Sequence, residues 1–353
     1  MRQSSAVTPP FDSVLVVSFG GPGGLADIRP FLANVLRGRR VTPERVEEVV
    51  KHYESFGGVS PITEITMRQA DGLRARLAAS ASPLPVYVGM RNWHPYLLDT
   101  LRAMHAAGHR RAIGFITAAQ HSYSSCQQYK ENVRDARAAL RAESGADVEV
   151  TFVESWYAHP LFIQVQAEHV RAALARLPEP ARERARLVCT AHSIPTAMAA
   201  RSRYQPQLSE TSRLVAEAAG IRDWTLVYQS RSGRPEDPWL EPDICDYLRQ
   251  ARAQGLEAAV ICPVGFVCDH IEVLFDLDRQ AADVCREIGL PMARSETVND
   301  DPVFVDMMAD VVQRTVRRYR TGRPLPIAPL PTPPGAPASA GRPGGPAGTR
   351  PRG

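Results

Sequence analysis

The sequence of 353 residues is long enough for two domains of ordinary size, and its 44% hydrophobic content allows a sizeable core. The formal charge of +4 resides in the four arginines of residues 323–353, because elsewhere 38 basic residues match 38 acidic ones. This balance argues against a nucleic-acid-binding protein. No apolar run approaches the roughly 18 residues of a membrane-spanning helix, and residues 1–10 lack the apolar core of a signal peptide, so we expect a cytoplasmic protein without a membrane span.

The first half of the sequence alternates apolar runs with helical patterns. The run at 14–17 is continuous, which is typical of a buried parallel strand. Thr42 and Pro43 have the residue types of a helix N-cap and first helical position. Strands are expected at 14–17, 85–89, 111–117 and 148–153, and helices at 27–36, from 43 onward, 65–79 and 97–107. This βαβα order predicts a parallel sheet flanked by helices.

Glycine and polar residues follow these strands, where parallel sheets bind ligands. The loop 18–24 is glycine-rich, but it has neither GxGxxG spacing nor a Walker lysine, which disfavours a nucleotide site. Arg91 and Asn92 follow the second strand. A run of hydroxyls at 118–125 follows the third, and it would either donate to an acidic ligand or cap the next helix. The basic cluster at 37–40 would either be a solvated helix end or anchor carboxylates.

The second half repeats the pattern. Strands are expected at 187–191, 224–228, 256–262 and 292–294, and helices at 160–177, 205–219, 241–253 and 301–318. Two similar halves that face each other would form a cleft between them. His192 follows the strand at 187–191, where a histidine can act as a base or a metal ligand, or simply hold a neighbouring loop.

A second strand end carries carboxylates. After the strand at 256–262, Pro263 and Gly265 interrupt the strand, and a helix follows whose beginning is rich in ionisable groups. At 3.6 residues per turn, Glu272, Asp276 and Gln280 share one helix face, because residues four apart stack. The apolar side chains on the other face are Val273, Leu274 and Leu277. The pattern therefore predicts a carboxylate-bearing helix beside the cleft.

Six short motifs, in order along the chain from about Val14 to about Tyr319, resemble the ferrochelatase family. They are the segments 18–22 (SFGGP), 56–61 (FGGVSP), 153–157 (VESWY), 190–195 (TAHSIP), 229–231 (QSR) with 238–242 (PWLEP), and 263–278 (PVGFVCDHIEVLFDLD). Within that family the sequence most resembles the soluble coproporphyrin III ferrochelatases of Gram-positive bacteria of the actinobacterial type.

The resemblance implies an α/β fold of the class II chelatase kind, with two Rossmann-like halves, parallel sheets flanked by helices and an active-site cleft between the halves. It implies that residues 11–157 with 301–320 form the first half, which contacts the porphyrin, and that residues 158–300 form the second. His192 and Glu272 match the catalytic and metal-binding pair, and Asp276 would extend a proton relay. Gln280 stands where some relatives carry a third carboxylate, so the acidic series is shorter here.

The porphyrin contacts implied by the resemblance lie in the first half. Phe19 stands where some relatives carry a tyrosine that ligates iron, and a phenyl ring cannot ligate. Arg91 and Asn92 stand where relatives carry other polar residues. The full implied set is Phe19, Arg37, Tyr53, Ser60, Arg91, Asn92, Tyr123, Ser124 and Tyr129.

The function implied by the resemblance is insertion of ferrous iron into a porphyrin in haem biosynthesis, most consistent with coproporphyrin III, whose four carboxylates suit a polar site. Protoporphyrin IX is the alternative substrate. A non-catalytic tetrapyrrole carrier would need the cleft but not both His192 and Glu272, and a nucleotide-sugar transferase would need a nucleotide loop that the sequence lacks. We expect a monomer that needs no cofactor beyond the Fe²⁺ substrate.

The cysteines and the last residues complete these expectations. No two of the six cysteines have CxxC spacing, so no zinc knuckle is expected and reduced thiols are the default. Some relatives hold a [2Fe-2S] cluster partly through a C-terminal extension, but no cysteine follows Cys285 here, so no cluster is expected. Residues 323–353 contain ten of the thirty prolines and few large apolar groups, which predicts a disordered tail.

Overall fold

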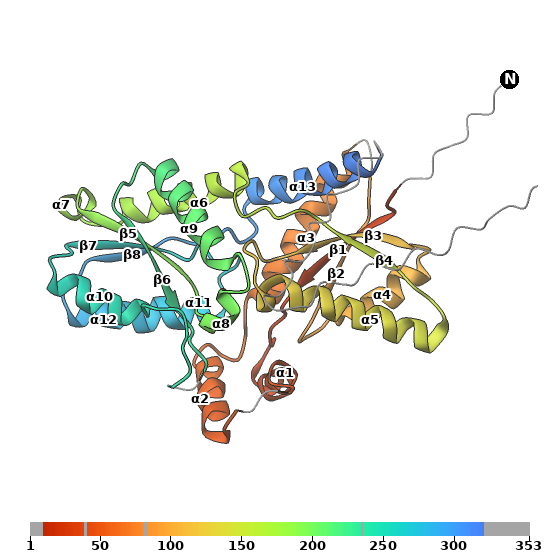
Figure 1. Cartoon of the computed structure of the whole chain (residues 1–353), viewed down its shortest axis with the longest axis horizontal. Coiled ribbons are helices and arrows are strands. Elements are labelled where there is room, and N and C mark those ends of the chain that lie inside the picture. Colours follow the sequence, from red (N-terminus) through yellow and green to blue (C-terminus); the bar gives the residue numbers. More distant parts are fainter. Residues whose placement is uncertain (1–9, 39–40, 81–82, 234–235, 321–353) are drawn as a thin grey trace, which may run out of the picture.

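The computed structural model describes residues 10–38, 41–80, 83–233 and 236–320. Within these ranges the chain forms two four-stranded sheets that lie side by side with helices packed around them (Figure 1). Every pair of neighbouring strands in both sheets is parallel. The predicted fold class of two parallel sheets flanked by helices is therefore confirmed. The tail predicted at 323–353, and Arg39 and Arg40 of the basic cluster, lie outside the described residues.

The first sheet has the strand order β2-β1-β3-β4. Its strands are β1 (Ser13–Ser18), β2 (Val86–Met90), β3 (Arg111–Ile116) and β4 (Glu149–Phe152). The helices of this half are η1 (Leu25–Asp27), α1 (Ile28–Val35), α2 (Pro43–Glu54), α3 (Ile62–Ala78), α4 (Leu97–Ala106), the π-turn η2 (Tyr123–Gln127) and α5 (Gln128–Ser144). The predicted cap of α2 is confirmed, because the Thr42 hydroxyl accepts a hydrogen bond from the Arg45 backbone N–H at 3.4 Å.

The second sheet has the strand order β6-β5-β7-β8. Its strands are β5 (Ala185–His192), β6 (Trp224–Gln229), β7 (Ala258–Cys262) and β8 (Met292–Arg294). The helices that follow β4 are α6 (Pro160–Ala175), α7 (Glu179–Arg182), α8 (Thr196–Ala199), α9 (Tyr204–Ala219), α10 (Ile244–Ala253), α11 (Ile271–Phe275), the π-turn η3 (Asp276–Ala281), α12 (Ala282–Glu287) and α13 (Pro302–Arg320). The short α7 and α8 were not predicted from the sequence.

The continuous apolar run of β1 has the burial that a central parallel strand requires. All six of its residues are buried. Val14 and Val16 pack on one face of the sheet with Leu73 of α3, whereas Leu15 and Val17 pack on the other with residues of α4 and α5. Helices thus cover both faces of this sheet, and its residues are excluded from water on either side.

Helix α13 joins the two halves. It packs against α3 of the first half and α6 of the second, along the top of the view in Figure 1. Phe304 is fully buried, and its ring lies 5.9 Å from that of Trp156 and 6.2 Å from that of Phe162. A Cβ at Gly72 of α3 would lie 3.0 Å from Val305, so the glycine lets α13 approach closely. Burying a side chain the size of Phe304 contributes about 1.5–3 kcal/mol of folding free energy.

The prediction of one regular α-helix after Glu272 is wrong. The α-helix α11 lasts only to Phe275, and the π-turn η3 separates it from α12. A π-turn closes i→i+5 hydrogen bonds, so it is wider than an α-turn. Gln280 lies within this turn and is exposed. The predicted apolar face persists, since Val273 and Leu277 are fully buried.

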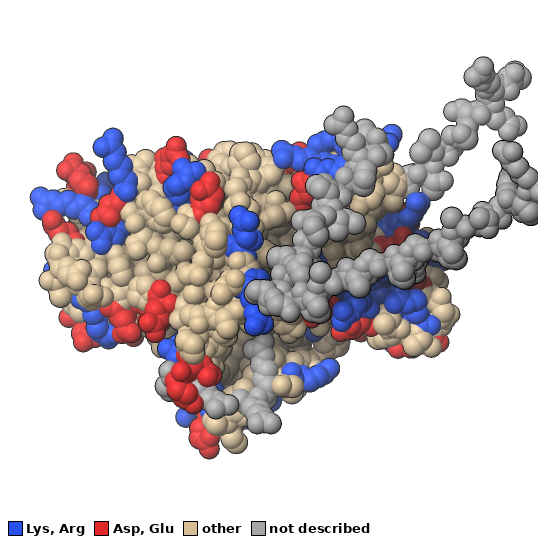
Figure 2. Space-filling model, in the orientation of Figure 1, with Lys and Arg blue, Asp and Glu red and all other residues tan. Residues whose placement is uncertain are grey.

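The molecular surface matches the balanced charge of the sequence. Acidic and basic side chains are interspersed over the visible part of the face in Figure 2, with no large area of a single sign. In the described part of the chain, none of the helices combines the length and the apolar character needed to cross a membrane.

Candidate active site

His192 and Glu272 come together at the carboxyl edge of the second sheet. His192 is the last residue of β5, and Glu272 is the second residue of α11. The Nε2 atom of His192 lies 3.8 Å from Oε2 of Glu272, and both side chains are partly exposed. Bonds from a first-row metal to nitrogen or oxygen are about 2.0–2.2 Å long, so two ligands 3.8 Å apart can share one ion.

The hydrogen bonds of His192 fix which ring nitrogen faces Glu272. Its Nδ1 contacts the backbone carbonyl of Ser193, and a carbonyl can only accept, so Nδ1 carries the proton. In the neutral imidazole, Nε2 is then the nitrogen with the free lone pair. The Tyr204 hydroxyl donates to the His192 carbonyl at 3.0 Å and holds the backbone at the strand end. The imidazole can therefore accept a proton or bind a metal ion on the Glu272 side.

Asp276 lies one turn beyond Glu272 and is held from β6. The Ser230 hydroxyl and the Gln229 amide, at 3.3 Å, both donate to Oδ2 of Asp276. The same Gln229 amide donates to the Glu272 carbonyl at 3.3 Å. Burial raises the pKa of Asp276 to about 6, although the hydrogen bond from Ser230 opposes the rise. A carboxyl group with this pKa can both take and release protons near neutral pH.

Gln229 and Ser230 belong to one of the motifs found in the sequence, but their contact with Asp276 was not predicted. Ser230 has a positive φ of 60°, which is uncommon for a residue other than glycine. This backbone conformation occurs directly after β6, where the hydroxyl meets Asp276. The contact joins two segments that are 46 residues apart, so no local sequence pattern could have indicated it.

His270 acts as a helix cap. Its Nδ1 accepts a hydrogen bond from the Glu272 backbone N–H at 3.1 Å, and its ring meets Phe266 edge-on at 5.2 Å. Burial lowers the pKa of His270, although the Glu272 carboxylate opposes this effect. The neutral form that accepts the hydrogen bond is thereby favoured, and the beginning of α11 is held in place.

Three of the predicted porphyrin contacts meet at the carboxyl edge of the first sheet. The Arg91 guanidinium lies 5.5 Å from the ring centroid of Phe19 and 4.9 Å from that of Tyr129. Both distances are within the range of cation–π attraction. Burial raises the pKa of Tyr129 to about 12, so its phenol stays neutral. Together these side chains form an aromatic surface around one partly buried cation.

Asn92 and Tyr53 lie close to this group. Asn92 is 5% exposed, and within the described chain its Nδ2 has no hydrogen-bond partner. Tyr53 meets Phe31 edge-on at 5.7 Å in a cluster that also includes Phe19. Burial raises the pKa of Tyr53, and the charge of Glu272 raises it further, which indicates that Tyr53 faces the second half.

Helix α2 carries Tyr53 to the second half through direct contacts with α11 and η3. The ring of His52 stacks on Phe275 at 3.7 Å. The Arg279 guanidinium lies 4.1 Å from the ring centroid of Phe56 and donates to the Ser55 carbonyl at 2.8 Å. These contacts bring the aromatic group of the first half and the ionisable group of the second half together.

The other predicted porphyrin contacts interact with neighbouring residues of the first half. Ser60 is buried and backs the glycine-rich loop, since a Cβ at Gly21 would lie 2.6 Å from the Ser60 Cβ. Arg37 is exposed and donates to Asn34 at 2.7 Å. The Tyr123 hydroxyl donates to Glu131 at 2.9 Å, and Ser124 lies 3.2 Å from the Ser122 hydroxyl. Among the described residues, no hydrogen bond or ion pair joins these four to His192 or Glu272.

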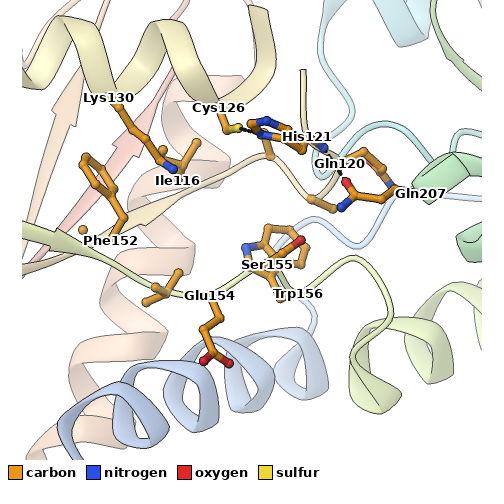
Figure 3. A pocket seen from close by; sticks show the side chains of 14 residues that line it. Ile116, Gln120, His121, Cys126, Lys130, Phe152, Glu154, Ser155, Trp156 and Gln207 are labelled. Atoms are coloured by element: carbon orange, nitrogen blue, oxygen red, sulfur yellow. Dashed lines mark hydrogen bonds between the residues drawn. The ribbon is translucent and has the colours of Figure 1, made fainter. Parts of the chain in front are cut away.

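A separate pocket of about 170 Å³ opens where β3 and β4 end (Figure 3). His121 and Cys126 contact each other at its wall, and Lys130 extends toward it, whereas the Glu154 carboxylate points to α13 and pairs with Arg318. Burial raises the pKa of the Cys126 thiol and lowers that of His121, so both groups stay neutral. None of the predicted site residues lines this pocket, and it is distinct from the His192–Glu272 pair.

Comparison with known proteins agrees with the fold and with the family resemblance of the sequence motifs. The profile of the family described as Ferrochelatase matches residues 12–316. A protein of Rhodopirellula baltica named Ferrochelatase is 49% identical over 307 residues, which cover 86% of each chain. A protein of Streptomyces griseus named Coproporphyrin III ferrochelatase is 47% identical over 318 residues, covering 86% of this chain and 85% of its own.

A solved structure supports the fold independently of sequence. SirB from Bacillus subtilis with Fe³⁺ superposes with a TM-score of 0.54 at 9% identity, over 88% of this chain and 98% of its own. At that identity the likeness concerns the fold alone. The family profile spans most of the chain, and the relatives share nearly half of their residues with it. The chain belongs to the ferrochelatase family.

Proposed function

We propose that this protein inserts ferrous iron into coproporphyrin III and so forms Fe-coproporphyrin III in haem biosynthesis. The observation that carries the proposal is the His192–Glu272 pair, in which Nε2 of the imidazole lies 3.8 Å from a carboxylate oxygen. Metal insertion releases two pyrrole protons as one Fe²⁺ ion enters, so the site needs a base, a metal ligand and a route for protons. This half of the molecule offers all three.

In the proposed mechanism, His192 and Glu272 receive the iron and the protons. Imidazole nitrogen and carboxylate oxygen are both suitable ligands for Fe²⁺. As iron moves to the pyrrole nitrogens, Nε2 of His192 is free to accept a proton, and the Glu272 carboxylate can take the other. Asp276, with a pKa of about 6, then passes protons toward solvent.

The first half would hold the macrocycle. Phe19 and Tyr129 offer aromatic faces to a flat porphyrin, and the Arg91 charge between them suits a carboxylate of the substrate. Asn92 has an amide available for a further hydrogen bond. Tyr53 and Ser60 would contact the ring margin, while Arg37, Tyr123 and Ser124 would meet carboxylates farther out. Four substrate carboxylates would use more of these polar groups than two.

The substrate is tested by a side-by-side insertion assay with coproporphyrin III and protoporphyrin IX. We expect kcat/KM to be at least tenfold higher for coproporphyrin III, a difference of about 1.4 kcal/mol in transition-state stabilisation. Preference for protoporphyrin IX would overturn the substrate assignment but not the chemistry. Binding of both porphyrins without insertion would instead identify a carrier.

We further propose that residues 11–157 with 301–320 bind the porphyrin and that residues 158–300 bind the iron. We also propose that the protein acts as a cytoplasmic monomer without a [2Fe-2S] cluster. The absence of cysteines after Cys285 supports the last point. Iron and acid-labile sulfide in anaerobically purified protein should be far below one equivalent. Light scattering should give a mass near 38.8 kDa, and a doubled mass would contradict the monomer.

A further inference from the structure

One arginine contacts both ends of the segment that carries Glu272 and Asp276. Arg294, the last residue of β8, donates from Nε and Nη2 to the two oxygens of Asp278 at 2.6 and 2.8 Å. Its Nη1 donates to Oδ1 of Asp269 at 2.8 Å. The Arg294 side chain is only 14% exposed. One planar guanidinium therefore holds two carboxylates in fixed directions.

These two carboxylates bracket the ionisable groups of the site. Asp269 precedes Glu272 by three residues, and Asp278 follows Asp276 by two. Asp278 lies inside the π-turn η3, where the backbone departs from the regular α-helical path. Fixing Asp269 and Asp278 to one rigid group consequently fixes the path of the chain between them, including the position of Glu272 relative to β5.

The bridge from Arg294 to Asp269 and Asp278 also has hydrogen-bond partners in the surrounding structure. Asn299 donates from Nδ2 to Oδ2 of Asp269 at 2.8 Å, and its Oδ1 accepts from the Asp269 backbone N–H at 2.9 Å. The Asn299 carbonyl accepts from Gln69 of α3 at 2.6 Å, which extends the network to the first half. Burial alone would lower the pKa of Arg294, but Asp278 and Asp269 more than offset it and the pKa is raised. The arginine thus remains charged.

We propose that Arg294 is a positioning residue for iron insertion, which bridges Asp269 and Asp278 and thereby holds Glu272 at its distance from His192. The inference rests on the proposed function, because it assigns Arg294 a role in that reaction. It does not make Arg294 a ligand or a base, since its donors are directed at Asp269, Asp278 and the Ser295 carbonyl.

The test compares Arg294→Lys and Asp278→Asn with a matched pair on the next helix. Lysine keeps the charge but is a point donor that cannot form the two-oxygen bridge and the Asp269 contact together. Asp278 is 38% exposed, so Asp278→Asn loosens the bridge with little risk to folding. The controls are Arg286→Lys and Asp283→Asn, an exposed ion pair of α12 that joins residues of one turn only.

We expect Arg294→Lys and Asp278→Asn to lower kcat by about 10- to 100-fold, as loss of groups that orient metal ligands does, while the porphyrin KM changes less than about twofold. The control variants should keep wild-type kcat. A wild-type kcat in either Asp278→Asn or Arg294→Lys would overturn the positioning role.

Amide hydrogen exchange without substrate gives a second readout that does not depend on activity. Residues 271–281 should exchange faster in Asp278→Asn than in the wild type, whereas Asp283→Asn should leave that segment unchanged. Unchanged exchange in Asp278→Asn would contradict the bridge even if the wild type proved not to insert iron. A wild type that inserts iron beside a fully active Asp278→Asn would refute the inference and leave the proposed function standing.

Discussion

The two sheets have the same strand arrangement, but the carboxyl edges that they present to each other are built differently. The edge of the second sheet holds His192, Glu272 and Asp276, which are positioned by hydrogen bonds from Gln229, Ser230 and the backbone. The edge of the first sheet holds Phe19, Tyr129 and Arg91, which are positioned by ring contacts and burial. Directional hydrogen bonds suit proton and metal chemistry, whereas aromatic faces suit a flat apolar ring. The proposed function would thus place the chemistry and the substrate binding on two edges of the same architecture.

The largest expected effect is on the chemical half. His192→Ala removes the base and a metal ligand together, so kcat for insertion should fall by about 10²–10⁴-fold or more. Porphyrin affinity, measured by fluorescence quenching, should stay within about threefold because the first half is intact. Retention of more than about a tenth of wild-type turnover would place less than roughly 1.4 kcal/mol of barrier on His192, and its assigned role would be wrong.

Glu272→Gln tests the partner of His192. Glutamine keeps the shape but removes the charge, so kcat should fall by about 100-fold with little change in porphyrin binding. Because the two residues act in one step, His192→Ala combined with Glu272→Gln should be scarcely slower than His192→Ala alone. Single-turnover insertion assays of the four proteins measure this directly. Multiplicative losses in the double variant would show that the residues act independently.

Arg91→Met tests the binding half. The substitution removes the cation between two rings while keeping an unbranched apolar side chain, so a substrate carboxylate loses its partner. We expect the porphyrin KM to rise about tenfold, equivalent to about 1.4 kcal/mol, with kcat within threefold. The control is Lys130→Met, because Lys130 makes a similar cation–π contact away from the site, 5.6 Å from the ring centroid of Phe152. A fall in kcat with unchanged KM would break the proposed division between the halves.

The smallest effect at neutral pH is expected for Asp276. Its pKa of about 6 means that the carboxyl group is ionised, and able to accept protons, above that pH and is protonated below it. Turnover should therefore fall as the pH decreases through about 6. Asp276→Asn should lower kcat at pH 7 by less than about tenfold and remove this acidic decline. A pH–rate profile that keeps the same decline in the variant would assign it to another group.

Much of the fold could be predicted, because apolar runs and alternating helical patterns are local signals. The ends of β5 and β7 placed His192 and the Glu272 segment at one sheet edge. The π-turn could not be predicted, since the periodicity argument assumed 3.6 residues per turn throughout. Arg294 was also missed, because its carboxylate partners lie 16 and 25 residues away and only the folded chain brings them together.

The hydroxyl-bearing residues at 118–125 show a different limit of prediction from the sequence. Tyr123 has the residue type of a substrate contact, yet its hydroxyl already donates to Glu131 eight residues later. The Ser122 side chain accepts from the Ser125 backbone N–H at 3.0 Å and caps the turn that leads into α5. Of the two interpretations left open for this run, capping describes Ser122 and Ser125, and a substrate role for Tyr123 and Ser124 stays a prediction.

The position of α13 has a consequence for synthesis on the ribosome. The helix that covers α3, and so completes the core of the first half, is the last one to be translated among the described residues. The strands and helices of the second half are contiguous and have all emerged before it. The half that is synthesised first must therefore wait with an uncovered apolar face on α3, and α6 of the second half waits for the same helix. Folding of this chain should be completed only when α13 packs on both, and the first half, which waits longest, is the part that most needs protection from aggregation.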